Sequence, residues 1–209
     1  MNVKDIKTIA MYGAGTIGGG FAAYFALKGL NVNVYVRSEA SKERALPHIQ
    51  GPIDSYVKLG LVDDGQKIWD KIKMTTDPAE AFTGVYFVQE NGAENLEQKH
   101  EMVAVMEKYM PVDGIIASSS SGTPVTQIAS EAQHPERIIE VFWEEDGPSG
   151  DTSFNVQIFV EALDRLNLLM DVASVLSEHG ANVLSVNTNT HRDGMVEMRF
   201  LFQVSDTAG

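Results

Sequence analysis

Apolar residues follow two alternating patterns along most of the chain. Short apolar runs, typical of buried strands, occur at 8–12, 32–36, 72–75, 85–89, 114–118 and 138–142. Between several of these runs the apolar residues have helical spacing, most clearly at 18–28, 66–71 and 96–109. Strands that alternate with helices predict an α/β fold with a parallel sheet and helices on both faces. The long segment 38–70 predicts an inserted helical excursion.

The pattern changes after residue 143. Residues 144–154 are acidic and rich in turn formers, which predicts a linker. The following segments predict, in order, a strand at 155–163, a helix at 168–178, and strands at 183–190 and 195–204 joined by a turn at 191–194. We therefore expect a first unit over 1–143, a linker over 144–154, and a small α+β unit of βαββ order over 155–209.

Three glycines stand where the first predicted strand meets the first predicted helix. Gly13, Gly15 and Gly18 have G-x-G-x-x-G spacing. The first allows a tight turn, the second lets a pyrophosphate approach the backbone, and the third lets the helix pack on the strand. Thr16 and Ile17 fall in the first helical turn, where N–H groups and the helix dipole favour an anion. This arrangement predicts a dinucleotide site, and the alternative is a glycine-rich turn without a ligand.

The end of the second predicted strand bears on the choice between NAD and NADP. NAD sites carry Asp or Glu roughly 20 residues after the glycines. Here the chain reads Tyr35-Val36-Arg37-Ser38, with Lys42 and Arg44 close behind. Arg37 can pair with a 2′-phosphate, assisted by Ser38, which favours NADP over NAD. In the alternative, Arg37 is a solvent-facing strand end and Glu39 reaches the ribose.

Composition and charge exclude several classes of function. The 209 residues include no Cys, and the five His lack metal-ligand spacing, so we expect neither thiol chemistry nor a metal site. No apolar run approaches the roughly 20 residues that a membrane helix needs. Residues 141–209 hold 3 basic and 11 acidic side chains, which disfavours nucleic-acid binding there. These features are typical of a cytoplasmic protein.

The first 140 residues resemble the N-terminal NAD-binding domain of the 3-hydroxyacyl-CoA dehydrogenases, especially the branch with L-carnitine dehydrogenase and lambda-crystallin-type L-gulonate dehydrogenase. The resemblance is carried by 13–18, 88–99, 117–122 and His134-Pro-Glu-Arg137. It implies a doubly wound Rossmann sheet and hydride transfer between nicotinamide and a 3-hydroxy acid or acyl-CoA. It also implies roles for four residues: Glu90, Glu94 and Lys99 near the nicotinamide ribose, and Ser120 as the catalytic residue that hydrogen-bonds the substrate oxygen. The alternative for the serines is a helix N-cap.

Two departures from that family predict weak catalysis. Matching the segment through Arg137 puts Phe142 where the family has its catalytic His, and the family's helical C-terminal domain does not follow. The alcohol proton still needs an acceptor, and Glu140 and Glu144 are the nearest carboxylates along the chain. We therefore expect dinucleotide binding with little or no turnover.

The second unit resembles the ACT domain that ends the bifunctional guanosine tetraphosphate synthetase/hydrolase proteins. The resemblance is carried by 156–165, 168–172 and 180–188. ACT domains are βαββαβ regulatory units that often pair side by side and bind amino acids. The place of a glycine common in that family holds Leu166-Asn167. A βαββ remnant leaves one sheet face uncovered, so we expect a homo-oligomer. The alternative function is a self-associating module that senses a dinucleotide or an amino acid. The two partial units together indicate a chimeric, a truncated or a computationally generated chain, and the sequence leaves these three alternatives open.

Overall fold

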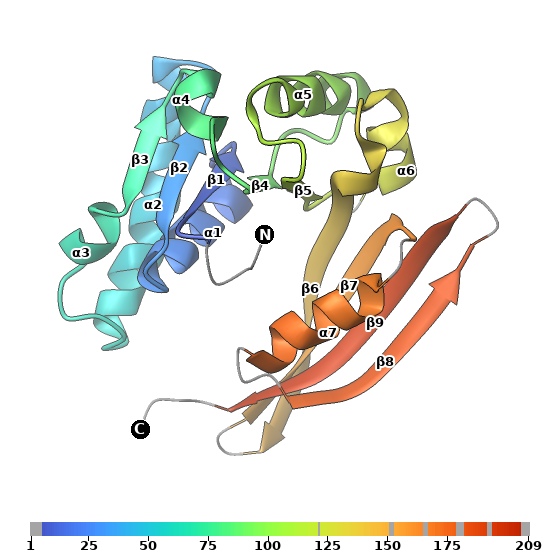
Figure 1. Cartoon of the computed structure of the whole chain (residues 1–209). Coiled ribbons are helices and arrows are strands. Elements are labelled where there is room, and N and C mark those ends of the chain that lie inside the picture. The colour runs from blue at the N-terminus through green and yellow to red at the C-terminus, as the bar shows by residue number, and fades with distance from the viewer. Residues whose placement is uncertain are drawn as a thin grey trace.

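The computed structural model describes residues 6–120, 122–150, 153–164, 167–178, 182–191 and 194–205. Within these ranges one nine-stranded sheet has the order β3-β2-β1-β4-β5-β6-β7-β9-β8 (Figure 1). Its strands are β1 (Thr8–Tyr12), β2 (Asn31–Tyr35), β3 (Ile72–Thr75), β4 (Phe87–Glu90), β5 (Ile115–Ser118), β6 (Ile138–Gly150), β7 (Ser153–Leu163), β8 (Asn182–Thr190) and β9 (Met195–Ser205). Its α-helices are α1 (Thr16–Leu27), α2 (Glu39–Lys58), α3 (Gln66–Trp69), α4 (Pro78–Phe82), α5 (Leu96–Tyr109), α6 (Val125–Ile128) and α7 (Leu168–Glu178).

The first unit is a doubly wound parallel sheet, as predicted. Strands β1 to β5 and the first residues of β6 pair in parallel. Alternate residues of each strand enter two different cores. On one face Met11 and Val34 pack with α1 and α2, and on the other Val88 and Ile116 pack with α4, α5 and α6. Because both faces are covered, the strands read as continuous apolar runs.

The second unit has the predicted βαββ order. Strands β7, β9 and β8 pair antiparallel, and α7 covers one face of them (Figure 1). The core under α7 includes Ile158, Val160 and Phe200, with Leu168 from the helix itself. Ile139 and Val141 of β6 pack against the same cluster, so β6 contributes to the cores of both units.

Residues 144–154 differ from the predicted linker. β6 continues through Gly150, and β7 begins at Ser153 and pairs antiparallel with β6. The physical reason is that β9 pairs with only one edge of β7. The backbone N–H and C=O groups on the other edge of β7 would lack partners without a neighbouring strand, and β6 supplies those partners. Residues 192 and 193 of the predicted hairpin turn lie outside the described residues.

Candidate functional site

The glycine loop connects β1 to α1, and two of its glycines are required by its shape. Gly13 has φ +88°, a conformation that side-chain-bearing residues rarely adopt. Its N–H donates to the Tyr35 carbonyl at 2.9 Å, which ties the loop to the end of β2. A Cβ at Gly18 would lie 2.4 Å from the Gly13 carbonyl oxygen. These contacts match the roles of the first and third glycines in a dinucleotide loop.

Gly15 differs from both, because its surroundings are open. A Cβ built there would meet no heavy atom within 4 Å. Gly15 is exposed, as are Thr16 and Ile17 in the first turn of α1. The first N–H groups of this twelve-residue helix are therefore not covered by side chains of the loop. An anion fits such a position because the helix dipole and the free N–H groups both favour negative charge.

A cavity of about 290 Å³ adjoins the loop and has a cationic rim. Arg37, from the end of β2, and Arg44 and His48, from α2, line it together with Ser41. None of the described residues that line it is acidic. The other lining residues are Tyr12, Gly13, Ala14, Gly15, Tyr35, Val36, Ala45, Gly92, Ala93 and Met102. The glycine loop and Arg37 thus share one cavity.

Ser38 has a different position from the one predicted. Its side chain caps α2 by accepting a bond from the Ser41 N–H at 3.2 Å, and Ser41 takes its place along the cavity. Arg44 Nη2 donates to the Ser41 hydroxyl at 2.8 Å. Sequence reasoning missed Ser41 and His48. Their spacing with Arg44 on α2 is a signal that could have found them, because residues three, four and seven apart share a helix face.

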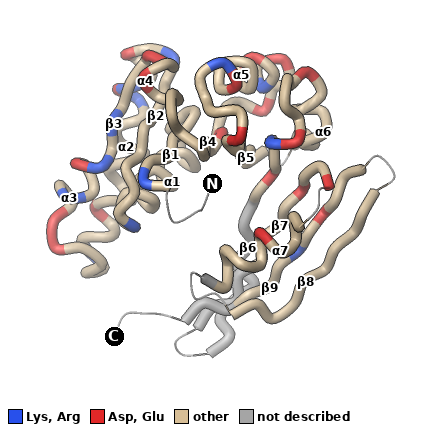
Figure 2. The backbone as a smooth tube through the Cα atoms, viewed as in Figure 1, with Lys and Arg blue, Asp and Glu red and all other residues tan. Residues whose placement is uncertain are grey.

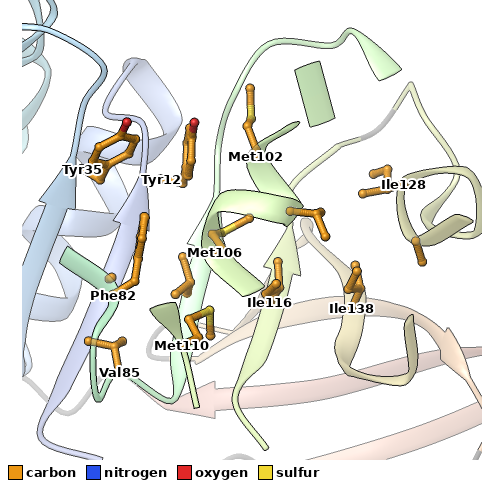
Figure 3. Close-up of a cluster of buried hydrophobic side chains, with 14 of the residues drawn as sticks. Tyr12, Tyr35, Phe82, Val85, Met102, Met106, Met110, Ile116, Ile128 and Ile138 are labelled. Carbon is orange, nitrogen blue, oxygen red and sulfur yellow. The ribbon is translucent and has the colours of Figure 1, made fainter. Parts of the chain in front are cut away.

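Two tyrosines, at the ends of the adjacent strands β1 and β2, also line the cavity. The rings of Tyr12 and Tyr35 pack edge to face, with centroids 4.9 Å apart, and both hydroxyls point to the same side (Figure 3). Burial, followed by the neighbouring Tyr35, raises the pKa of Tyr12 to about 12. Tyr12 is therefore a neutral hydroxyl at physiological pH and can donate a hydrogen bond.

Glu90 and Lys99 meet beneath the surface rather than facing the cavity. Lys99 Nζ, from α5, donates to Glu90 Oε2 at 2.9 Å, and the Ser118 hydroxyl donates to the same oxygen at 2.7 Å. Glu90 Oε1 accepts from the Gly92 N–H. All three side chains are at most 1% exposed. This network orders the loops after β4 and β5, and each of its polar atoms named here has a partner.

Ser120 and Glu94 form a second pair above this network. The buried Ser120 hydroxyl donates to Glu94 Oε2 at 2.5 Å and accepts from the Thr123 N–H at 3.1 Å. Glu94 is exposed, so this pair reaches solvent. The structure brings Ser120 and Glu94 together, and the Ser120 N–H donates to the Ser118 hydroxyl at 3.3 Å, which links this pair to the buried network.

A line of side chains crosses the sheet next to these groups. Strand register places Tyr12, Glu90, Ser118, Glu140 and Glu161 beside one another on five adjacent strands. Burial, followed by the neighbouring Glu161, raises the pKa of Glu140 to about 7. The side chains of Phe142 and Glu144 lie outside the described residues.

Two absences apply to the part of the chain that the structure describes. It contains no group of three or more His, Asp or Glu placed to hold a metal ion. It also contains no helix with the length and apolar character needed to cross a bilayer.

Comparisons with known proteins assign the two parts of the chain to different families. Residues 8–145 match the family model of the 3-hydroxyacyl-CoA dehydrogenase NAD binding domain, and residues 150–209 match an ACT domain model. L-carnitine dehydrogenase from Streptomyces griseus is 32% identical over 136 residues, which cover 65% of this chain and 40% of that protein. The chain thus spans less than half the length of that relative.

The second part has different relatives. The bifunctional (p)ppGpp synthase/hydrolase RelA from Mycobacterium tuberculosis is 44% identical over 84 residues, which cover 40% of this chain and 11% of that protein.

A solved structure supports the fold of the first unit. (S)-3-hydroxybutyryl-CoA dehydrogenase PaaH1 from Ralstonia eutropha has a TM-score of 0.61 and 26% identity, covering 66% of this chain and 49% of that one. The glycine loop, the sheet order and the matched range agree, and the chain belongs to the 3-hydroxyacyl-CoA dehydrogenase NAD-binding family.

Proposed function

We propose that this protein binds a nicotinamide dinucleotide across the carboxyl ends of β1, β2, β4 and β5. The pyrophosphate lies over Gly15 against the first N–H groups of α1, and the adenosine half enters the cavity beside Arg37. The nicotinamide half then extends toward Ser120 and Glu94. The open space at Gly15, next to a helix N-terminus, is the observation that carries this proposal.

We further propose a preference for NADPH over NADH. Arg37, Arg44 and His48 line the same cavity, and no described residue there offers a carboxylate to hold a ribose 2′-hydroxyl. A 2′-phosphate adds charge that two guanidinium groups can pair with, and planar guanidinium groups suit phosphate oxygens. Ser41, held by Arg44, adds a hydroxyl at the same rim.

The proposed activity is hydride transfer to or from a 3-hydroxy acid or acyl-CoA, at a strongly reduced rate. Oxidation of an alcohol needs a group that accepts its proton. By resemblance to the 3-hydroxyacyl-CoA dehydrogenases, Phe142 takes the position of the family's catalytic His, and its phenyl ring cannot accept a proton. Ser120 can orient a substrate oxygen once its hydroxyl exchanges its bond to the solvent-facing Glu94 for a bond to the substrate. We therefore expect this chain to bind a dinucleotide and to catalyse hydride transfer only slowly.

Titration of the purified protein with NADH and with NADPH, followed by nicotinamide fluorescence, tests the binding proposal. We expect saturable binding of both, with NADPH tighter. Equal dissociation constants would remove the NADPH preference, and no binding of either would remove the dinucleotide proposal. Oxidation of L-carnitine and a 3-hydroxyacyl-CoA is measured on the same sample, and rapid turnover would contradict the proposed impairment.

A second candidate function is regulation through self-association, and the edge strand β8 favours it. All nine residues of β8 lack charge and proline, and Figure 2 shows this strand without a charged position. The opposite edge, β3, is short and carries Lys73. Natural sheets protect free edges with charge, proline or short length, so an unprotected edge is suited to pairing. Val186→Lys should turn a dimer into a monomer by light scattering, and unchanged mass would contradict this candidate.

A further inference from the structure

Glu140 occupies the one position of β6 that belongs to two different ladders among the described pairings. In the parallel ladder it is the last partner, opposite Ser118 of β5. In the antiparallel ladder it is the first partner, opposite Glu161 of β7. Glu140 therefore marks the point where the dinucleotide unit joins the C-terminal unit. We call the three positions Ser118, Glu140 and Glu161 the junction.

The groups around the Glu140 carboxyl give it little compensation for a negative charge. It is 7% exposed and accepts one bond from the Val125 N–H, at the start of α6. Across the junction it faces Glu161, and from the loop after β4 it faces Glu94. Lys99 of α5 is the cation on this side, and its ammonium group is already bonded to Glu90.

The far side of the junction holds a third carboxylate, Glu197, whose ion-pair partners are Arg199 and His191. Register places Glu197 of β9 beside Glu161, and Arg199 Nη2 lies 2.7 Å from Glu197 Oε1. Like charges directly opposite on neighbouring strands destabilise their pairing. A buried carboxylate beside a second carboxylate favours the neutral form.

We propose that Glu140 is a proton-binding residue at the junction, which strengthens the pairing of β6 with β7 when neutral and weakens it when ionised. The neutral carboxyl still accepts the bond from Val125 and no longer repels Glu161. The ionised carboxylate keeps that bond but adds a buried negative charge opposite a second one. The association of the C-terminal unit with the dinucleotide unit thus depends on pH.

The direction of the pH dependence follows from the raised pKa of Glu140. In the folded protein this pKa is about 7, above the ordinary value of 4.5. The folded state therefore binds more protons than the unfolded state between these values, and its stability falls as pH rises. Below about pH 4.5 the contribution is complete, and above about pH 7 it is lost.

Glu140→Gln tests the proposal because Gln has nearly the same shape, accepts the bond from Val125 and does not ionise. Thermal unfolding of the full chain is followed from about pH 5 to about pH 8. We expect similar midpoints for the two proteins at the acidic end, and a midpoint for the unsubstituted protein several degrees lower at the basic end. Parallel curves over the whole range would overturn the proposal.

Two further variants locate the effect. Glu161→Gln removes the opposing charge, so the decline with pH should become smaller while Glu140 stays in place. Glu43→Gln removes an exposed carboxylate of α2 and should follow the unsubstituted protein. If Glu140→Gln does not fold, as judged by circular dichroism, the decision rests on Glu161→Gln, and an unchanged decline then overturns the proposal. Backbone amide signals of residues 158–162 should titrate with a midpoint near pH 7 in the unsubstituted protein only.

Discussion

The two ends of the candidate dinucleotide site are built in opposite ways. At the glycine loop, Gly15 faces open space, and Arg37 and Arg44 line a cavity without a carboxylate among its described residues. At the ends of β4 and β5, Glu90, Lys99 and Ser118 are buried and bonded to one another. The glycine-loop end leaves backbone N–H groups and cationic side chains available to a charged ligand. At the ends of β4 and β5 the charged side chains are already bonded to one another.

This difference separates recognition from chemistry. An open helix N-terminus with cationic neighbours needs only a phosphate-bearing ligand to complete it. A reaction needs a proton acceptor that is placed at the substrate, and the buried network offers none of its bonded groups for that purpose. The contrast explains how a chain can retain dinucleotide binding with reduced turnover, as we propose.

The largest effect is expected at the buried network of Glu90, Lys99 and Ser118. Lys99→Met leaves the Glu90 carboxylate buried without its cation, which should lower the free energy of unfolding by about 3–5 kcal/mol. Urea denaturation measures this change. The double variant Lys99→Met/Glu90→Gln should recover much of the loss, and Lys108→Met, at an exposed position of α5, is the matched control. A loss equal to that of Lys108→Met would show that the ion pair does not hold this end together.

A smaller effect is expected within the loop itself. Gly18→Ala places a Cβ 2.4 Å from the Gly13 carbonyl oxygen, and this overlap should cost about 1–3 kcal/mol in the free energy of unfolding. Gly20→Ala, in the same helix, meets nothing within 4 Å and should raise stability by about 0.5–1 kcal/mol. Thermal unfolding compares the two. Equal changes at both positions would contradict the close contact between α1 and the loop.

The smallest effect is expected at Arg44, which lines the cavity beside the glycine loop. Arg44→Ala should weaken NADPH binding by about tenfold, as expected for one charge-assisted hydrogen bond, and leave NADH binding nearly unchanged. Lys42→Ala is the control, because Lys42 pairs with Glu39 and is not among the residues that line the cavity. Calorimetric titration gives both constants. An equal loss for NADH and NADPH would mean that Arg44 does not distinguish a 2′-phosphate.

Much of the fold could be predicted from the sequence because its signals are local. Apolar runs gave the buried strands of the first unit, and helical spacing gave α5 and α7 with the bounds observed. The extent of β6 could not be predicted, since residues 144–150 have linker composition and become a strand only because β7 needs a partner. Pairing with β7 therefore determines the conformation of residues 144–150, although their composition is typical of a linker.

The candidate site divides in the same way. Gly13, Gly15 and Gly18 were predicted because each role requires the absence of a side chain, which sequence spacing reveals. The mutual pairing of Glu90 and Lys99 was not predicted, because two charged residues nine positions apart give no sign of whether they face a ligand or each other. The sequence offered Glu140 only as a candidate proton acceptor, and its place opposite Glu161 emerged from the strand register.

Binding of NADH to Gly15→Val and to Gly20→Val, compared with the unsubstituted protein, tests whether the glycine loop holds the pyrophosphate of a dinucleotide. Both positions leave room for a Cβ, so both variants should fold. We expect Gly15→Val to lose affinity by about a hundredfold, because its side chain occupies the place of the pyrophosphate, and Gly20→Val to keep its affinity. Equal affinity in both variants, with intact folds, would contradict a dinucleotide site at this loop.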